Sequence, residues 1–154
     1  KPKEYDGDWF NNKRHGQGKC VYWNNNVYEG QWRFNFRHGK GKLVFANGDI
    51  FDGEFEAGSI TGYGIFTYSN GEKYTGHLAN GIYHGMGEKQ FKNGNIYKGN
   101  WDDGEISGKG KMIYANGDFY DGYWYNGKKN GLGQYVSQKN NSYKGVVKNR
   151  VKVN

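Results

Sequence analysis

Polar and apolar positions alternate along most of this 154-residue chain, and the alternation restarts every 23 residues. In the clearest copy, residues 28–50, the aromatic residues Tyr28 and Trp32 flank Gly30, with a polar residue in each gap. A period of two sends alternate side chains to opposite faces of a β-strand. The pattern therefore predicts strands with one aromatic face and one charged face.

Glycine marks the rest of each 23-residue unit, because all 27 glycines fall at only five of its positions. A second strand is predicted to begin at a Gly-x-Gly such as Gly39 and Gly41, where the missing Cβ atoms leave room for a neighbouring ring. Asn-Gly pairs such as Asn47-Gly48 are strong signals of a tight hairpin turn, since both positions tolerate positive φ. Positions six to ten of each unit are predicted to form a looser loop.

Each unit therefore reads as a β-hairpin that contacts mainly its neighbours, as in solenoids. At the usual strand spacing, two strands per unit give about 10 Å of rise. We expect an all-β, single-layer antiparallel hairpin solenoid that forms an elongated twisted rod with an aromatic groove. The array is predicted to follow a lead-in at residues 1–4 and to comprise residues 5–27, 28–50, 51–73, 74–96, 97–119 and 120–142, with a partial unit at 143–154.

The combination of Tyr-x-Gly-x-Trp, His-Gly-x-Gly and Asn-Gly at this period resembles the MORN (membrane occupation and recognition nexus) repeat. Six full copies cover the chain from Tyr5 onward, with the largest departures at residues 134–142 and at Val147. The resemblance implies a scaffold in cytoskeletal, ciliary or membrane-associated assemblies. It also leaves open an accessory module of a larger enzyme, since similar repeats accompany lipid kinase and methyltransferase domains. The start at Lys1 and the end within a unit indicate a fragment.

The net charge of +7 comes entirely from the end of the chain, because acids and bases balance before Lys128. Two interpretations are open: this end binds an anionic surface, or its charges discourage edge-to-edge aggregation. We expect an anionic phospholipid rather than nucleic acid as the partner in the first case. The residues predicted for that role are Lys128, Lys129, Lys144, Lys148 and Arg150.

No catalytic motif, signal peptide or transmembrane segment is evident, and the single cysteine, Cys20, fits a reducing compartment. His15, His38 and His84 share one position of the unit, but adjacent copies would lie about 10 Å apart, whereas zinc ligands lie about 2 Å from one ion. We expect these histidines to make structural hydrogen bonds. The chain is predicted to be a cytoplasmic protein without enzyme activity, metal or cofactor.

Two surfaces are candidates for a protein partner such as a peptide or an amphipathic helix. The first is an aromatic groove, in which most of each ring is expected to be structural while part of it stays exposed. The second is an apolar stripe at the loop edge, whose side chains alternatively fold back over the sheet. The groove residues are Tyr5, Trp9, Tyr28, Trp32, Phe51, Phe55, Tyr74, Tyr97, Trp101, Tyr120 and Trp124. The stripe residues are Phe36, Ile60, Ile82, Tyr83 and Ile106, and Trp23 and Phe34 are also off the pattern.

The function predicted from these features is a non-enzymatic scaffold that binds segments of partner proteins. Self-association into a homodimer is a further expectation, because the edge of a solenoid is an unpaired strand. The scaffold is expected to belong to a cytoskeletal or membrane-associated assembly. Phosphoinositide or anionic-membrane binding is the rival prediction.

Overall fold

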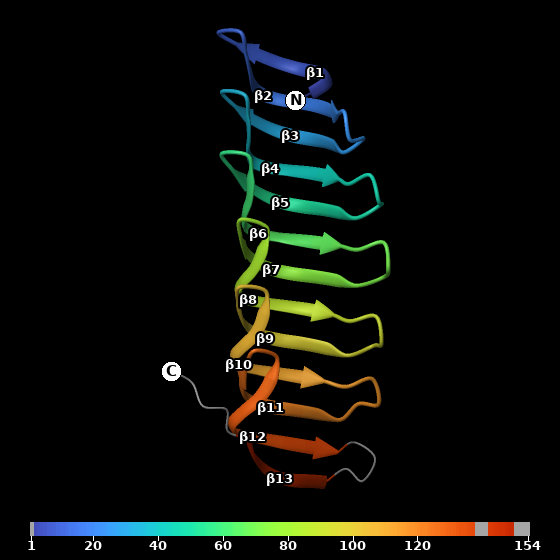
Figure 1. Cartoon of the computed structure of the whole chain (residues 1–154), viewed down its shortest axis with the longest axis vertical. Helices are drawn as coiled ribbons and strands as arrows, with labels where there is room; N and C mark the ends of the chain where they lie inside the picture. The colour runs from blue at the N-terminus through green and yellow to red at the C-terminus, as the bar shows by residue number, and fades with distance from the viewer. Residues whose placement is uncertain (1, 138–141, 150–154) are drawn as a thin grey trace. The chain divides into compact units, whose positions relative to one another are not determined.

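The computed structural model describes the backbone of residues 2–137 and 142–149 and the side chains of residues 2–137. Within these residues the chain forms β-strands and turns, with no helix (Figure 1). The strands are β1 (Pro2–Phe10), β2 (Lys13–Tyr22), β3 (Val27–Arg33), β4 (Phe36–Val44), β5 (Ile50–Glu56), β6 (Ser59–Thr67), β7 (Lys73–Ala79), β8 (Ile82–Gln90), β9 (Ile96–Asp102), β10 (Glu105–Ile113), β11 (Phe119–Tyr125), β12 (Lys128–Ser137) and β13 (Ser142–Asn149).

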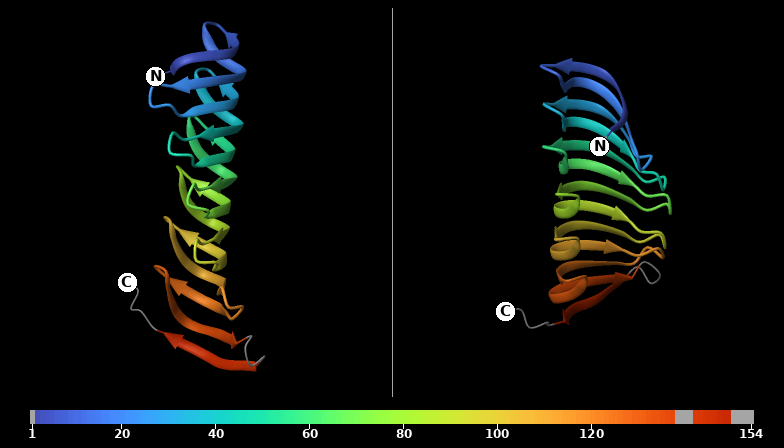
Figure 2. Two further views of the ribbon diagram at one scale, coloured as in Figure 1. Left: turned by 90° about the vertical axis from the view of Figure 1, so that its right-hand side faces the viewer. Right: turned by 45° about the horizontal axis from the view of Figure 1, so that its top comes forward.

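The chain divides into two compact parts, residues 1–81 and 82–154, each of which contains several of the 23-residue repeats. We call these two parts the first and second unit, and each 23-residue stretch a repeat. The first contains β1 to β7 and the second β8 to β13. In each unit, strands that follow one another in the chain pair antiparallel in one sheet (Figures 1 and 2). The predicted single-layer antiparallel fold is therefore confirmed.

The tight turns lie where the sequence predicted loose loops. Phe34 and Asn35 form the whole connection between β3 and β4, and their φ angles of 45° and 73° are those of a type I′ turn. The same pair of positive φ angles recurs at Asn11-Asn12, Ala57-Gly58, Asn80-Gly81, Asp103-Gly104 and Asn126-Gly127.

The Asn-Gly pairs instead occupy longer connections. Residues 45–49 join β4 to β5, and in them the N–H of Gly48 donates to the carbonyl oxygen of Phe45 at 2.9 Å. Only Gly48 of the Asn47-Gly48 pair has a positive φ. The prediction of two-residue hairpins at these pairs is therefore wrong, because the asparagine side chain accepts the backbone N–H of Asp49 and supports a wider turn.

Alternate residues of each strand form a face that we call the ring face, and it holds the buried side chains. Tyr28, Phe51 and Tyr74 in the first unit and Tyr97 and Tyr120 in the second have no exposed surface. The phenol ring of Tyr28 lies against Gly30 and Gly41, where a Cβ atom would overlap it. Glycine thus allows an aromatic ring to replace the second layer of a sandwich.

The tyrosine hydroxyl also satisfies a backbone group that the sheet leaves free. The register of β3 and β4 shifts between Gly30 and Trp32, which is a β-bulge. The hydroxyl of Tyr28 donates to the carbonyl oxygen of Gln31, inside this bulge, at 2.7 Å. Tyr74 and Tyr97 make the same bond to the residue three positions later.

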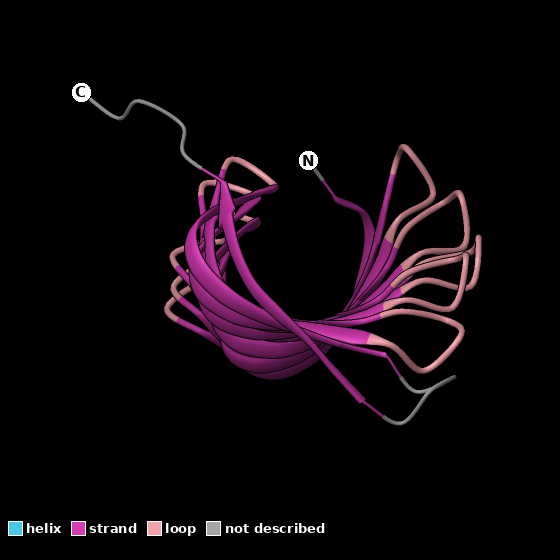
Figure 3. Ribbon diagram, turned by 90° about the horizontal axis from the view of Figure 1, so that it is seen from below, coloured by secondary structure: helices cyan, strands magenta, loops and turns pink. Residues whose placement is uncertain are grey.

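The strands of each unit bend along their length, so that one face becomes concave (Figure 3). Arg37 of β4 and Arg14 of β2 occupy the same position in their repeats. In a straight β2 strand, Arg14 would lie about 26 Å from Tyr22 at the other end. The guanidinium carbon of Arg37 nevertheless lies 5.7 Å from the centre of the Tyr22 ring. A side chain spans this distance only across the inside of a bend, so the ring face is the concave one.

The opposite, polar face carries the charges. In the first unit, cross-strand neighbours alternate in sign, from Asp6 through Lys19, Glu29 and Lys42 to Asp52. Opposite charges on facing positions stabilise strand pairing, each by a few tenths of a kcal/mol up to about 1 kcal/mol. Charge on this face therefore supports the sheet, while the ring face supplies its core.

Candidate functional site

The predicted groove residues are the core of the sheet rather than an open surface. All are buried except Tyr5, which is half-buried, and Trp9, which is 59% exposed. Tyr28 contacts Trp32 and Phe55 edge to face, with ring centres 5.1 and 5.0 Å apart. The prediction of a partly exposed aromatic groove is wrong for nine of the eleven side chains, because strand bending closes the rings over one another.

The loop-edge stripe separates into two sets that point in different directions. Ile60 and Tyr83 are half-buried and Ile106 is buried, and Tyr83 packs edge to face on Trp101 at 5.1 Å. These three fold back over the ring face, which was the alternative left open by the sequence. Phe36 and Ile82 are exposed by 56% and 48%.

Two further exposed side chains, Phe10 and Phe34, and the half-buried His15 lie with Phe36 at the hairpin tips of the first unit. The imidazole of His15 lies between two rings, 5.6 Å from Phe10 and 4.6 Å from Phe34. Phe10 is 53% exposed and Phe34 is 42% exposed. Phe34 and Phe36 both line a hollow of about 400 Å³, the tip hollow. We call Phe10, His15, Phe34 and Phe36 the tip strip.

Phe34 holds a backbone conformation that its side chain disfavours. Its φ of 45° lies in the left-handed region, where a bulky residue is a genuine outlier. Four other repeats place asparagine or aspartate, which tolerate this conformation, at the same turn position, and the third repeat has Ala57. The sequence marked Phe34 only as off the pattern, and Phe10 was missed, because aromatic residues dominate the pattern around it.

Two arginines lie over the rings of the first unit. The guanidinium carbon of Arg14 is 4.9 Å from the centre of the Trp32 ring, and that of Arg37 is 5.4 Å from Phe55. Both arginines border a hollow of about 220 Å³, which we call the arginine hollow. Its other walls come from Pro2, Tyr22, Trp32, Asn35, Phe36 and Gly58. The sequence indicated no role for Arg14 or Arg37.

Neither arginine has a carboxylate partner within the part of the chain that the structure describes. Arg14 donates from Nε and Nη2 to the side chain and carbonyl oxygens of Asn35, at 3.3 and 3.2 Å. Arg37 donates from Nη2 to the carbonyl oxygen of Gly58 at 2.7 Å. A guanidinium has five N–H donors in a fixed fork, so each arginine keeps donors for a ligand.

Exposed apolar side chains also occur on the polar face of each unit. Tyr63 and Ile65 are exposed by 48% and 37% in the first unit, and Tyr63 packs edge to face on His77. In the second unit, Tyr123 and Leu132 line a hollow of about 500 Å³. These side chains follow the strand alternation without backbone strain, and the sequence interpretation did not single them out.

The histidines make the structural hydrogen bonds that the sequence predicts at two of three positions. The Nδ1 atom of His15 accepts the backbone N–H of Phe34 at 3.2 Å, and that of His84 accepts the N–H of Asp103 at 3.4 Å. His38 lines the tip hollow. At this position of the repeat, His15 and His84 therefore each support the tight turn of the next repeat.

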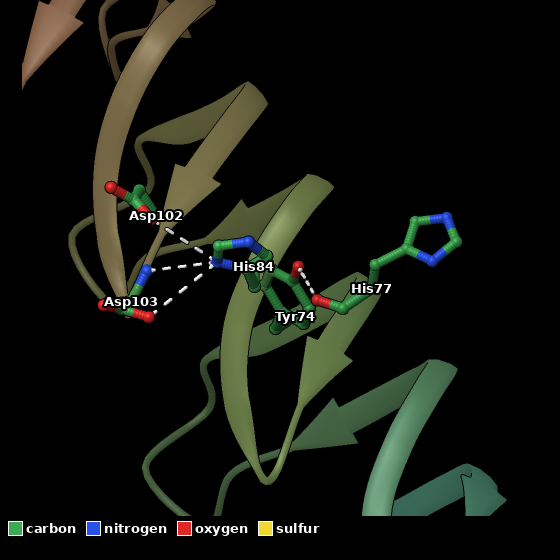
Figure 4. Close-up of polar contacts among 5 residues, drawn as sticks. All are labelled: Tyr74, His77, His84, Asp102 and Asp103. Atoms are coloured by element: carbon green, nitrogen blue, oxygen red, sulfur yellow. Dashed lines mark hydrogen bonds and ion pairs between the residues drawn. The ribbon is translucent and has the colours of Figure 1, made fainter.

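His84 also approaches two carboxylates, those of Asp102 at 3.5 Å and Asp103 at 3.9 Å (Figure 4). All three side chains are at least half exposed, and Nδ1 already accepts a backbone hydrogen bond. Exposed acidic groups of this kind are common without a metal ion. The same view shows Tyr74 of the first unit, whose hydroxyl donates a hydrogen bond to the carbonyl oxygen of His77. The imidazole of His77 points away from this bond.

The single thiol is structural. Cys20 has no exposed surface, and burial raises the pKa of its thiol, which disfavours the reactive thiolate.

The predicted lipid-binding residues are only partly within the described part of the chain. Lys128 is exposed, whereas Lys129 lies over the rings of Tyr120 and Tyr135, at 5.1 and 5.5 Å. The side chains of Lys144 and Lys148, and the whole of Arg150, lie outside the described residues. The described residues also contain no helix that is long and apolar enough to span a membrane.

Comparison with solved structures supports the fold. The TCP domain of SAS-4 from Drosophila melanogaster, in complex with a proline-rich motif of Ana2, aligns with 87% of this chain and 72% of that domain's chain. The TM-score is 0.55 and the sequence identity is 17%. At this identity the likeness is one of fold. No similar protein is found among curated sequences.

The family model of the MORN repeat matches residues 5–27, 28–50, 51–73, 74–96, 97–119 and 120–142. These spans are the six full repeats expected from the glycine pattern. MORN repeats are non-enzymatic repeat modules that generally serve in protein or membrane interactions. The chain belongs to the MORN-repeat family.

Proposed function

We propose that this chain is a non-enzymatic binding module that holds a segment of a partner protein against the tip strip of its first unit. The observation that carries the proposal is the exposed aromatic ring of Phe34 at a left-handed turn position. Such a backbone conformation costs on the order of 1–3 kcal/mol, and strain of this kind concentrates at functional sites. A folding requirement does not account for Phe34, because asparagine fills this position without strain.

The surroundings of Phe34 support this assignment. Phe36 is exposed next to it, and the two rings line the tip hollow together with Arg33, His38, Glu56 and Ala57. Aromatic side chains with charged residues at the rim are typical of the energetic centre of protein interfaces. The proline-rich motif bound by the SAS-4 TCP domain is a precedent for peptide recognition on a related fold.

The buried groove residues act differently in this proposal: their rings hold the hairpins in place, so that the tips present a fixed surface. Binding therefore depends on Phe34 and Phe36, and stability depends on Tyr28 and its equivalents. Self-association, anionic-lipid binding through the basic end, and a cytoskeletal or membrane-associated location stay predictions of the sequence. The proposal does not depend on them.

The test is a selection of random dodecapeptides displayed on phage against the immobilised chain. The double variant Phe34→Asn and Phe36→Thr removes both rings while placing a favoured residue at the turn. The matched control is Tyr63→Thr with Ile65→Thr, which removes two exposed apolar side chains from the polar face of the same unit.

We expect the chain to enrich specific peptides whose affinity falls at least tenfold in the Phe34/Phe36 variant and less than twofold in the control. Melting of both variants is followed by circular dichroism, and the Phe34/Phe36 variant is expected to be no less stable than the parent. Absence of any enriched peptide, or equal losses in the two variants, would contradict the proposal.

A further inference from the structure

The concave side of the first two repeats carries two guanidinium groups that the fold does not neutralise. Arg14 and Arg37 occupy the tenth position of their repeats, where the third repeat has Ile60. Ile60 is half-buried opposite Phe55, so an apolar side chain can fill this position. Each guanidinium uses only some of its N–H donors in hydrogen bonds to Asn35 or Gly58, and packing at this position does not require its positive charge.

Carboxylates of the neighbouring strands β3 and β5 lie on the other face. Glu29 and Asp52 belong to the polar-face ladder, where they oppose Lys19 and Lys42. Among the described residues, no aspartate or glutamate lines the arginine hollow. The concave side of these repeats is thus electrostatically positive, while the opposite face is balanced.

We propose that the arginine hollow binds the acidic side chains of the partner segment that the tip strip holds. The inference rests on the proposed function and names the chemistry of the partner. Phe36 connects the two surfaces, since it lines both the tip hollow and the arginine hollow. A segment that crosses Phe36 reaches both arginines without leaving the first unit.

The geometry of the arginines fits carboxylates. Each guanidinium lies over aromatic rings. Arg14 also donates a hydrogen bond to Asn35 and Arg37 to the carbonyl oxygen of Gly58, and these contacts fix their orientation. A fixed guanidinium edge matches a carboxylate with two parallel N–H···O bonds. The hollow, at about 220 Å³, is smaller than typical small-molecule pockets of roughly 300–1,000 Å³, so it suits individual side chains.

The spacing of the arginines favours an extended segment. Arg14 and Arg37 lie on β2 and β4, two strands apart, which corresponds to about 10 Å between their backbones. In a polyproline II segment, residues three apart share a side at about 9 Å. Two acids separated by two residues in such a segment therefore match the two arginines.

The test determines the sequences of the phage-displayed peptides that are selected by the parent chain and by two variants, each of which loses two positive charges. Arg14→Gln with Arg37→Gln removes the charges of the hollow, and Lys19→Gln with Lys40→Gln removes two exposed charges elsewhere in the same two repeats, away from both hollows. We expect peptides selected by the parent to be enriched in aspartate and glutamate, with pairs at a spacing of three. For the strongest peptide, replacing its acids by glutamine or introducing Arg14→Gln/Arg37→Gln should each weaken binding at least tenfold, and the control variant less than threefold.

A variant with Arg14→Lys and Arg37→Lys keeps the charge and the stacking but loses the forked geometry. It keeps the inference testable if the glutamine variant unfolds, and we expect it to weaken binding three- to tenfold. Enriched peptides without acids, or equal losses in the hollow and control variants, would overturn this inference while leaving the proposed function intact. Failure to enrich any peptide would contradict both.

Two other ligand sources are tested with the same variants. A phosphoserine version of the strongest peptide that binds more than tenfold tighter than the glutamate version would overturn the inference in favour of a phosphorylated partner. Co-sedimentation with phosphatidylserine vesicles that depends on Arg14 and Arg37, without acidic peptides among those selected, would overturn it in favour of a membrane surface.

Discussion

The indole N–H of Trp32 donates to the carbonyl oxygen of Gly18, in the preceding repeat, at 3.0 Å. Trp101 and Trp124 make the same bond to Gly87 and Gly110. Each bond joins a tryptophan of one hairpin to the Gly-x-Gly of the hairpin before it. The repeats are therefore linked by side-chain hydrogen bonds inside the ring face as well as by the backbone ladder.

Trp32→Phe should remove this link while keeping an aromatic ring, as Phe55 does naturally at the same position. Loss of a buried hydrogen bond and of part of the ring is expected to lower the free energy of unfolding by about 2 kcal/mol. Urea denaturation measures the change. Trp23→Phe, at a side chain that is 66% exposed, is the control and should change it by less than about 0.5 kcal/mol.

Gly41→Ala tests whether glycine is needed for the ring of Tyr28. The added Cβ would overlap the phenol, which is buried and cannot withdraw, so we expect a loss of more than about 3 kcal/mol or failure to fold. Gly81→Ala is the comparison, since its φ is +80° and no atom lies within 4 Å of the added Cβ. Only the left-handed conformation opposes that change, at a cost of about 1 kcal/mol. Equal losses would refute the steric role of Gly41.

Ala57→Asn should stabilise the chain, because Ala57 has a φ of 47° at the first position of a type I′ turn. Asparagine tolerates this conformation better, and we expect a gain of about 0.5–1 kcal/mol in the free energy of unfolding. Thermal and urea denaturation measure it. A loss of stability would mean that the side chain of Ala57 has a packing role that outweighs its backbone strain.

Alkaline pH should destabilise the fold through its buried tyrosines. Burial raises the pKa of Tyr74 from 10.0 to about 12, so the unfolded chain loses this proton first as the pH rises. Stability from this group is complete below pH 10 and falls between pH 10 and 12, by at most about 1.4 kcal/mol per pH unit. Urea denaturation at pH 8, 10 and 11 should show a smaller decline in Tyr74→Phe. An unchanged decline would show that Tyr74 does not titrate differently on unfolding.

The sequence predicted the repeats and the single-layer fold because the first aromatic residue and the glycines at positions three, twelve and fourteen recur in all six full repeats. It misassigned the tight turn because two glycine positions compete for that role in each repeat. At the true turn, Phe34 and Ala57 replace the residues that would have identified it, while Asn126-Gly127 and Asp103-Gly104 carried the correct signal. The error thus arose where two repeats depart from the common turn chemistry.

The sequence predicted a structural role for most of each groove ring, but it did not predict that nine of the eleven side chains are buried. Alternation with a period of two assigns Tyr28 and Trp32 to a face but says nothing about curvature. A flat sheet would leave these rings open, whereas bent strands bring side chains from both ends together, as in the contact of Arg37 with Tyr22. The proposed binding surface is therefore formed by Phe34 and Phe36, which stay exposed, and not by the groove residues.

The most direct test of this account is photo-crosslinking of the strongest selected dodecapeptide. Benzoylphenylalanine is placed in turn at Phe36, at Tyr63 on the polar face, and at Tyr123 in the second unit, all of which are about half exposed. We predict a crosslink to the peptide from position 36 and none above background from the other two. A crosslink from position 63 or 123 in the absence of one from position 36 would contradict the account.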